Sequence, residues 1–113
     1  MVLSNEILNP LTIRQQLYLS QERMSHLLHV SCKTLWRWEN SDTSSSSKAK
    51  EHLAKLKQIA SLAQKVYTQK GVGEFMFTPQ EEFDGHTAYD IISLGEYDRV
   101  IAALAADYEG LGY

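Results

Sequence analysis

The most constraining feature of the sequence is a twenty-residue segment from Gln21 to Asn40, in which apolar residues fall at unequal intervals. Its fourth, fifth, eighth, tenth, fifteenth and eighteenth positions are apolar or small, and these are Met24, Ser25, Leu28, Val30, Leu35 and Trp38. Two short helices that pack at a steep angle around a tight turn bury residues at these positions, so the pattern predicts a helix-turn-helix. His29 occupies the turn position, where a positive φ would cost its side chain about 1 kcal/mol relative to glycine.

Serines placed before each of these two helices support the prediction. The hydroxyl of Ser20 can cap the helix that begins at Gln21, and Ser31 can cap the second helix in the same way. Upstream, an arm that closes at Pro10 is expected to precede a short helix with spaced residues Leu11, Arg14, Gln15 and Tyr18. Downstream, the polar run at 40–47 predicts a loop.

A run without glycine or proline from Lys48 to Lys70 predicts the longest helix of the chain. Its apolar residues recur at gaps of three and four, and Ile59, Leu62 and Val66 widen the apolar face. This width leaves two interpretations open: the helix joins two protomers of a homodimer, or it forms the centre of a monomer core. Gly71-Val-Gly73 is expected to end the helix.

The last third of the chain predicts several shorter helices. Thr78-Pro79 suits a capped helix start, Gly85 breaks that segment, a brief helix covers 89–93, and a final helix follows Gly95. No alternating pattern of useful length predicts a strand, so the expected fold class is all-α. We expect three regions: residues 1–47 as the helix-turn-helix region, 48–70 as the long connecting or dimerisation helix, and 71–113 as an acidic helical partner-binding region.

Charge divides the chain into two unlike parts. Residues 1–70 hold ten Lys and Arg against five acids, a net charge of +5. Residues 71–113 hold Arg99 against nine acids, a net charge of −8. A basic front and an acidic back favour two surfaces with different partners, although charge that only maintains solubility can also produce such an asymmetry.

Several classes of protein are disfavoured by the composition. No stretch approaches the about 20 apolar residues that a membrane span requires, and the single cysteine, Cys32, fits a reducing compartment, so a cytoplasmic protein is expected. No nucleophile, base and acid combination predicts an enzyme, and no cofactor is expected. The spacing of His26, His29 and Cys32 invites a zinc hypothesis, but it lacks a fourth ligand, so no metal site is predicted.

Four short motifs give the first half its family resemblance, and they are Ser20-Gln21, Val30-Ser31, Thr34-Leu35 and Arg37-Trp38-Glu39. In these residues the chain resembles the Xre/Cro-like regulators, which implies that the second helix of the motif lies in the DNA major groove. The residues that would then contact double-stranded DNA are Gln21, Ser31, Lys33, Thr34, Trp36, Arg37 and Asn40. For Trp36 a contact with a partner protein is an equal alternative. An ordinary helical hairpin without a DNA role is the alternative for the whole segment.

The acidic part resembles the C-terminal toxin-binding domain of the Xre/MbcA/ParS-type antitoxins. The motifs that carry this resemblance are Thr78-Pro79, Phe83-x-Gly85-x-Thr87, Asp90-Ile91-Ile92, Gly95 and Val100 to Leu104. Two positions depart from the family pattern: phenylalanines at 75 and 77 where the family tends to have Trp, and Ala88 where it tends to have Pro.

This second resemblance implies a type II antitoxin that neutralises a RES-domain toxin, which consumes NAD, and represses its own operon. It also implies that the tail formed by Gly110, Leu111, Gly112 and Tyr113 reaches into the toxin, although a frayed terminus is the simpler interpretation. A stand-alone Xre-like transcription regulator and a ParS-like interaction adaptor without a toxin are the alternative functions.

Overall fold

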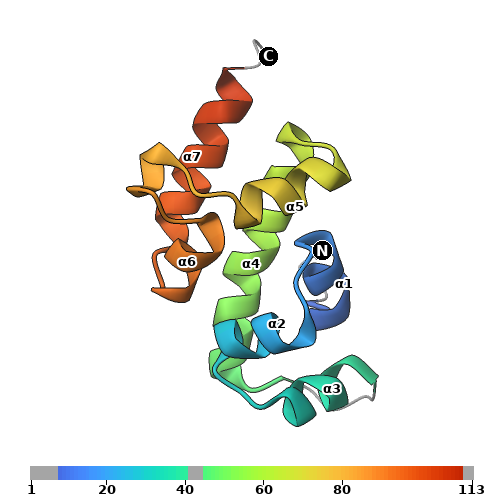
Figure 1. Cartoon of the computed structure of the whole chain (residues 1–113). Coiled ribbons are helices and arrows are strands. Elements are labelled where there is room, and N and C mark those ends of the chain that lie inside the picture. The colour runs from blue at the N-terminus through green and yellow to red at the C-terminus, as the bar shows by residue number, and fades with distance from the viewer. Residues whose placement is uncertain (1–7, 41–44, 111–113) are drawn as a thin grey trace.

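The computed structural model describes residues 8–40 and 45–110 (Figure 1). Within these residues the chain forms seven α-helices and one 3-10 turn, which are α1 Pro10–Gln16, α2 Gln21–Leu28, α3 Cys32–Asn40, α4 Ser47–Val66, α5 Gln69–Phe77, η1 Glu81–Phe83, α6 Ala88–Ser93 and α7 Tyr97–Glu109. The described residues form no strand beyond an isolated bridge between Gln80 and His86, so the all-α prediction is confirmed. None of the described helices is both long and apolar enough to cross a membrane.

Helix α4 is the longest helix and the centre of the core. The hydroxyl of Ser46 caps it by accepting a hydrogen bond from the backbone N–H of Ala49 at 3.2 Å. Five of its apolar side chains are fully buried, and they are Leu53, Leu56, Ile59, Ala60 and Ala63. The helix packs against α1 and α2 on one side and α7 on the other, and also against α5 (Figure 1). Contacts within the chain therefore account for its wide apolar face, which favours the interpretation as the centre of a monomer core.

The predicted end of this helix was wrong. Helix α4 ends at Val66, Tyr67 is extended, and Thr68 caps a new helix by accepting a hydrogen bond from the N–H of Gly71 at 3.1 Å. Gly71 and Gly73 therefore lie inside α5 instead of ending α4. Gly73 is required for close packing inside α5, because a Cβ atom there would lie 2.6 Å from the ring of Tyr18.

The expected helix start at Thr78-Pro79 was also wrong. Thr78 is the extended residue that ends α5, and only the single turn η1 follows. Gln80 explains the difference, because its backbone N–H donates to the carbonyl of His86 at 3.0 Å and its side chain donates to the carbonyl of Phe75 at 3.1 Å. These bonds hold 78–86 as a compact loop with Phe83 buried beneath it.

The first helix begins earlier than predicted and buries other residues. Pro10 lies at the start of α1, not at the end of an arm, and the side chain of Asn9 accepts hydrogen bonds from the N–H groups of the next turn. Pro10, Ile13 and Leu17 are buried, and none of them is among the residues whose spacing predicted this helix. Tyr18, which is among them, has a left-handed backbone and an exposed side chain.

Contacts between side chains join the two halves. The guanidinium of Arg23 in α2 lies 4.4 Å from the ring centre of Phe77, and the hydroxyl of Tyr89 donates to the carbonyl of Arg23 at 3.3 Å. Tyr67 donates to Asp107 of α7 at 3.0 Å, and this bond together with burial raises the pKa of Tyr67 to about 12. The first three helices and the acidic half therefore form one packed unit.

We expect Leu53→Ala to lower the free energy of unfolding by about 2–5 kcal/mol, because it opens a cavity in the centre of α4. Leu94→Ala is the matched control, since Leu94 is 68% exposed and its truncation should change stability by less than about 0.5 kcal/mol. Urea unfolding followed by circular dichroism measures both. Equal midpoints for the two variants would contradict the central position of α4.

Candidate nucleic-acid interface and partner-binding face

The turn between α2 and α3 centres on His29, whose backbone is left-handed with φ 59° and ψ 40°. The positive φ predicted at this position is confirmed. Ser25 lies where the two helices meet, because its hydroxyl donates to the carbonyl of Glu22 at 2.8 Å and lies 3.3 Å from the sulfur of Cys32. A larger side chain at Ser25 would push the start of α3 away, so the small residue in the pattern has a direct steric reason.

Four of the six positions predicted to be buried are buried, and they are Met24, Ser25, Leu28 and Leu35. Val30 and Trp38 are only half-buried and pack at the edge of the core. The prediction that Trp38 fills the core was therefore wrong. Helix α3 packs mainly against α1 and α2 at one end of the molecule (Figure 1).

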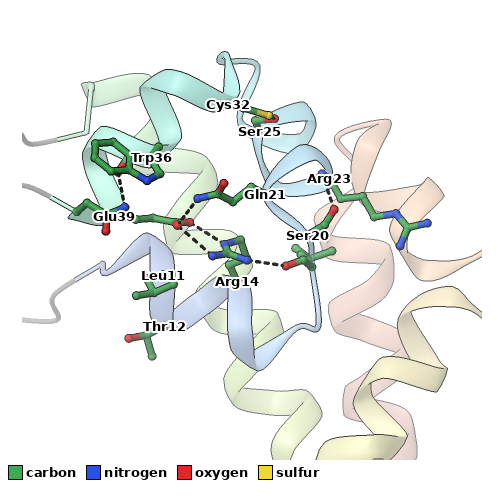
Figure 2. A network of polar contacts seen from close by, with 12 residues as sticks. Leu11, Thr12, Arg14, Ser20, Gln21, Arg23, Ser25, Cys32, Trp36 and Glu39 are labelled. Atoms are coloured by element: carbon green, nitrogen blue, oxygen red, sulfur yellow. Dashed lines mark hydrogen bonds and ion pairs between the residues drawn. The ribbon is translucent and has the colours of Figure 1, made fainter.

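An ion pair that the sequence analysis missed holds the motif together (Figure 2). The guanidinium of Arg14 donates from Nε to Glu39 Oε2 at 2.7 Å and from Nη2 to Glu39 Oε1 at 3.0 Å. A third bond runs from Nη1 to the carbonyl of Leu19 at 3.2 Å. The side chain of Glu39 is 2% exposed and that of Arg14 is 18% exposed. This two-pronged pair fixes α1 against the end of α3.

Gln21 belongs to the same network. Its amide nitrogen donates to Glu39 Oε1 at 2.9 Å, so the side chain lies half-buried beside the ion pair (Figure 2). The bond fixes the amide at the start of α2, where a contact with DNA is expected. That contact remains a prediction.

The solvent-facing side of α3 carries most of the other residues that were expected to bind DNA. Lys33, Trp36, Arg37 and Asn40 are all exposed, and Trp36 is 54% exposed. Their spacing places them on one side of the helix, opposite the buried Leu35. The amide of Asn40 donates to the carbonyl of Trp36 at 2.9 Å, which fastens the last turn.

Ser31 and Thr34 form the N-terminal cap of the same helix. Ser31 accepts a hydrogen bond from the N–H of Thr34 at 3.1 Å, which confirms its predicted capping role. Its hydroxyl also donates to the hydroxyl of Thr34 at 3.0 Å, and Arg37 approaches that oxygen at 3.4 Å. The structure therefore brings six of the seven expected DNA contacts onto α3 and its cap, with Gln21 at the neighbouring helix start.

The acidic half contains little positive charge. Arg99 lies 2.9 Å from Asp84 and 3.5 Å from Glu96, and also donates to the carbonyl of Glu82 at 3.2 Å. From α4, Lys55 pairs with Asp98 at 3.0 Å. Exposed carboxylates without an ion pair among the described residues include those of Glu74, Glu81 and Glu109. This half therefore presents a net negative surface.

The start of α6 shows why the resemblance includes Thr87 and Asp90. Thr87 donates its backbone N–H to the carboxylate of Asp90 at 3.0 Å, and the N–H of Asp90 donates to the hydroxyl of Thr87 at 3.0 Å. The backbone bond from Thr87 lowers the pKa of Asp90. The pair is a reciprocal helix cap, so these two motif residues have a structural role.

The expected partner-binding tail is only partly described. Gly110 caps α7, and its N–H donates to the carbonyl of Ala106 at 2.9 Å. Leu111, Gly112 and Tyr113 lie outside the described residues. Among the described residues no group of three or more His, Cys, Asp or Glu is placed to hold a metal ion.

No protein-family model matches the chain. The chain is 25% identical over 97 residues to the mycobacterial cidal antitoxin MbcA of Mycobacterium bovis and of Mycobacterium tuberculosis, which covers 86% of this chain and 86% of each relative. A match of 97 residues in a chain of 113 begins at residue 17 or before and ends at residue 97 or after. It therefore includes residues 17–97. It therefore takes in the helix-turn-helix and most of the acidic half.

A solved structure shares the fold. A chain in the crystal structure of the M. tuberculosis MbcT–MbcA toxin–antitoxin complex superposes with a TM-score of 0.77 at 23% identity. The match covers 92% of this chain and 94% of that chain. The arrangement of helices is therefore shared over nearly the full length of both.

We expect Glu39→Ala to lower the free energy of unfolding by about 3 kcal/mol, because it leaves the Arg14 guanidinium half-buried without its counter-charge. Glu74→Ala is the matched control, since Glu74 is an exposed helical glutamate and its removal should cost less than about 0.5 kcal/mol. Thermal unfolding of the two variants and the wild type distinguishes them. A Glu39→Ala protein as stable as the Glu74→Ala protein would show that the ion pair does not support the motif.

Proposed function

We propose that this chain is the antitoxin of a toxin–antitoxin pair, a non-enzymatic protein that binds DNA with α2 and α3 and a toxin with its acidic half. The similarity to MbcA carries the proposal, because its span takes in α2, α3 and most of the acidic half. MbcA is an antitoxin, and the similar solved structure is that of a complex between a toxin and an antitoxin. The shared fold supports the same class of role for this chain.

The DNA-binding part of the proposal is supported by the exposed face of α3. Lys33 and Arg37 lie four residues apart on that face, and such side chains contact guanine edges or phosphates when a helix enters the major groove. Two cations beside the exposed Trp36 on one side of a short helix suit a nucleic-acid partner. Repression of the protein's own operon follows if the site lies in its promoter, and a palindromic operator would require a homodimer.

We expect Arg37→Ala to weaken binding to DNA from upstream of the protein's own gene by about 1–3 kcal/mol, roughly a 5- to 150-fold rise in Kd. The reason is the loss of a cation from the outward face of α3. Lys70→Ala is the matched control, because Lys70 is an exposed cation on α5, outside the motif, and its loss should leave Kd nearly unchanged. Fluorescence anisotropy at two salt concentrations, with scrambled DNA for comparison, measures the effect.

Either of two results would count against this part of the proposal. Equal and weak binding to both DNAs would favour the ParS-like adaptor, in which the helix-turn-helix only contributes packing. An Arg37→Ala protein that is folded and binds DNA as tightly as the wild type would show that other residues make the DNA contact.

The toxin-binding part is supported by the acidic surface and by the composition of the tail. Helix α7 ends at Glu109, and Gly110 to Tyr113 follow it in the sequence. A short segment that ends in an aromatic residue suits insertion into a cleft of a partner. From the family resemblance we infer that this partner is a RES-domain toxin.

We expect a chain that ends at Glu109 to lose its ability to rescue cells from a toxin encoded beside its gene, while its DNA affinity changes less than twofold. Growth after co-expression measures rescue, and cellular NAD content tests the RES assignment, since such a toxin lowers NAD. Tyr113→Ala separates the aromatic ring from the remainder of the tail. Full protection by the shortened chain would assign toxin binding to the packed surface of the acidic half, and absence of any toxin would favour a stand-alone regulator.

A further inference from the structure

His52 lies where the helix-turn-helix meets the last helix of the acidic half. Its Nδ1 atom is 2.6 Å from the hydroxyl of Tyr97, the first residue of α7. Its ring centre is 5.5 Å from that of His29, edge to face, and His29 is the left-handed residue of the motif turn. The two histidines line a cleft of about 260 Å³, together with Leu28, Val30, Ser46, Lys48 and Ala49. One imidazole therefore contacts both halves of the molecule.

The charged and titratable groups around His52 lie on three elements. On α4 they are Lys48, Glu51 and Lys55; on the motif turn, His29; and on α7, Tyr97 and Asp98. The carboxylate of Asp98 pairs with Lys55 at 3.0 Å.

The other neighbours of His52 do little to stabilise its charged form. Burial raises the pKa of Tyr97, so its phenol stays neutral. Glu51 alone favours the charged ring, whereas burial, His29 and Lys48 all lower the pKa of His52 below its usual 6.5.

We propose that His52 is a proton-sensitive joint that holds the helix-turn-helix turn against the start of α7 while its imidazole is neutral. Protonation places a positive charge beside Lys48 and His29 and makes both ring nitrogens donors. From the neutral tautomer whose Nδ1 accepts from Tyr97, protonation makes the Tyr97 hydroxyl accept instead and turn its own proton away from the ring. The joint loosens on acidification, and this holds whether or not the protein binds DNA or a toxin.

The direction of the pH dependence follows from the lowered pKa of His52. The unfolded chain takes up the proton at about pH 6.5, and the folded chain takes it up only at lower pH. The contribution of the joint is therefore complete above about pH 6.5. It is lost as the pH falls from there through the folded-state pKa, in a range where most carboxylates are still ionised.

The test combines NMR titration of the His52 ring with urea unfolding at pH 7.5 and pH 5.5. In the wild type we expect a His52 midpoint below 6.5, a lower urea midpoint at pH 5.5, and loss of cross-relaxation between the His29 and His52 rings on acidification. In His52→Gln, whose amide can still accept from Tyr97, the fall in urea midpoint between the two pH values should be smaller. His86→Gln is the control, because the side chain of His86 is 62% exposed, and it should behave like the wild type.

A His52 midpoint at or above 6.5 would overturn the proposal, as would an equal pH dependence in His52→Gln and the wild type. The NMR titration uses the wild-type chain alone, so it tests the His52 midpoint even if the His52→Gln variant folds poorly.

Discussion

Burial of one face of α4 against helices from both halves is the interaction on which the other parts of the structure depend. Its fully buried side chains belong to the same cluster as Ile13 of α1, Met24 of α2 and Leu104 of α7. The basic front and the acidic back therefore share one core, although their surfaces differ in sign. A domain of this size gains more from one continuous core than from two small ones.

Local patterns predicted much of this fold, and tertiary contacts explain the rest. The periodic apolar residues predicted α4, and the unequal spacing at 21–40 predicted α2, its turn and α3, because these signals depend on neighbours within a few residues. The sequence pattern predicted that Gly73 ends a helix, but a glycine is needed there because the ring of Tyr18, which is distant in sequence, packs against it. The pair of Arg14 and Glu39 is separated by 25 positions, so no spacing rule could have joined them.

The exposure of Lys33, Trp36, Arg37 and Asn40 was predictable, because exposure on a short amphipathic helix follows from its buried positions. Glu39 shows what residue types alone do not reveal. It is an acid on the helix expected to approach phosphates, yet its carboxylate is turned inward and bound by Arg14 and Gln21. The acid therefore adds to the rigidity of the motif and presents almost no negative charge to a polyanion. The last three residues of the tail lie beyond what the structure describes.

Tyr18, just before α2, and His29, just after it, both adopt the left-handed backbone conformation, which glycine takes more easily. Tyr18 and His29 both have φ near +59°, and the side chain of each contacts an element outside the motif: Tyr18 lies on Gly73 of α5, and His29 on His52 of α4. A glycine at either position would relieve the backbone and lose the contact. The position of α2 is thus fixed near both of its ends by contacts with α4 and α5.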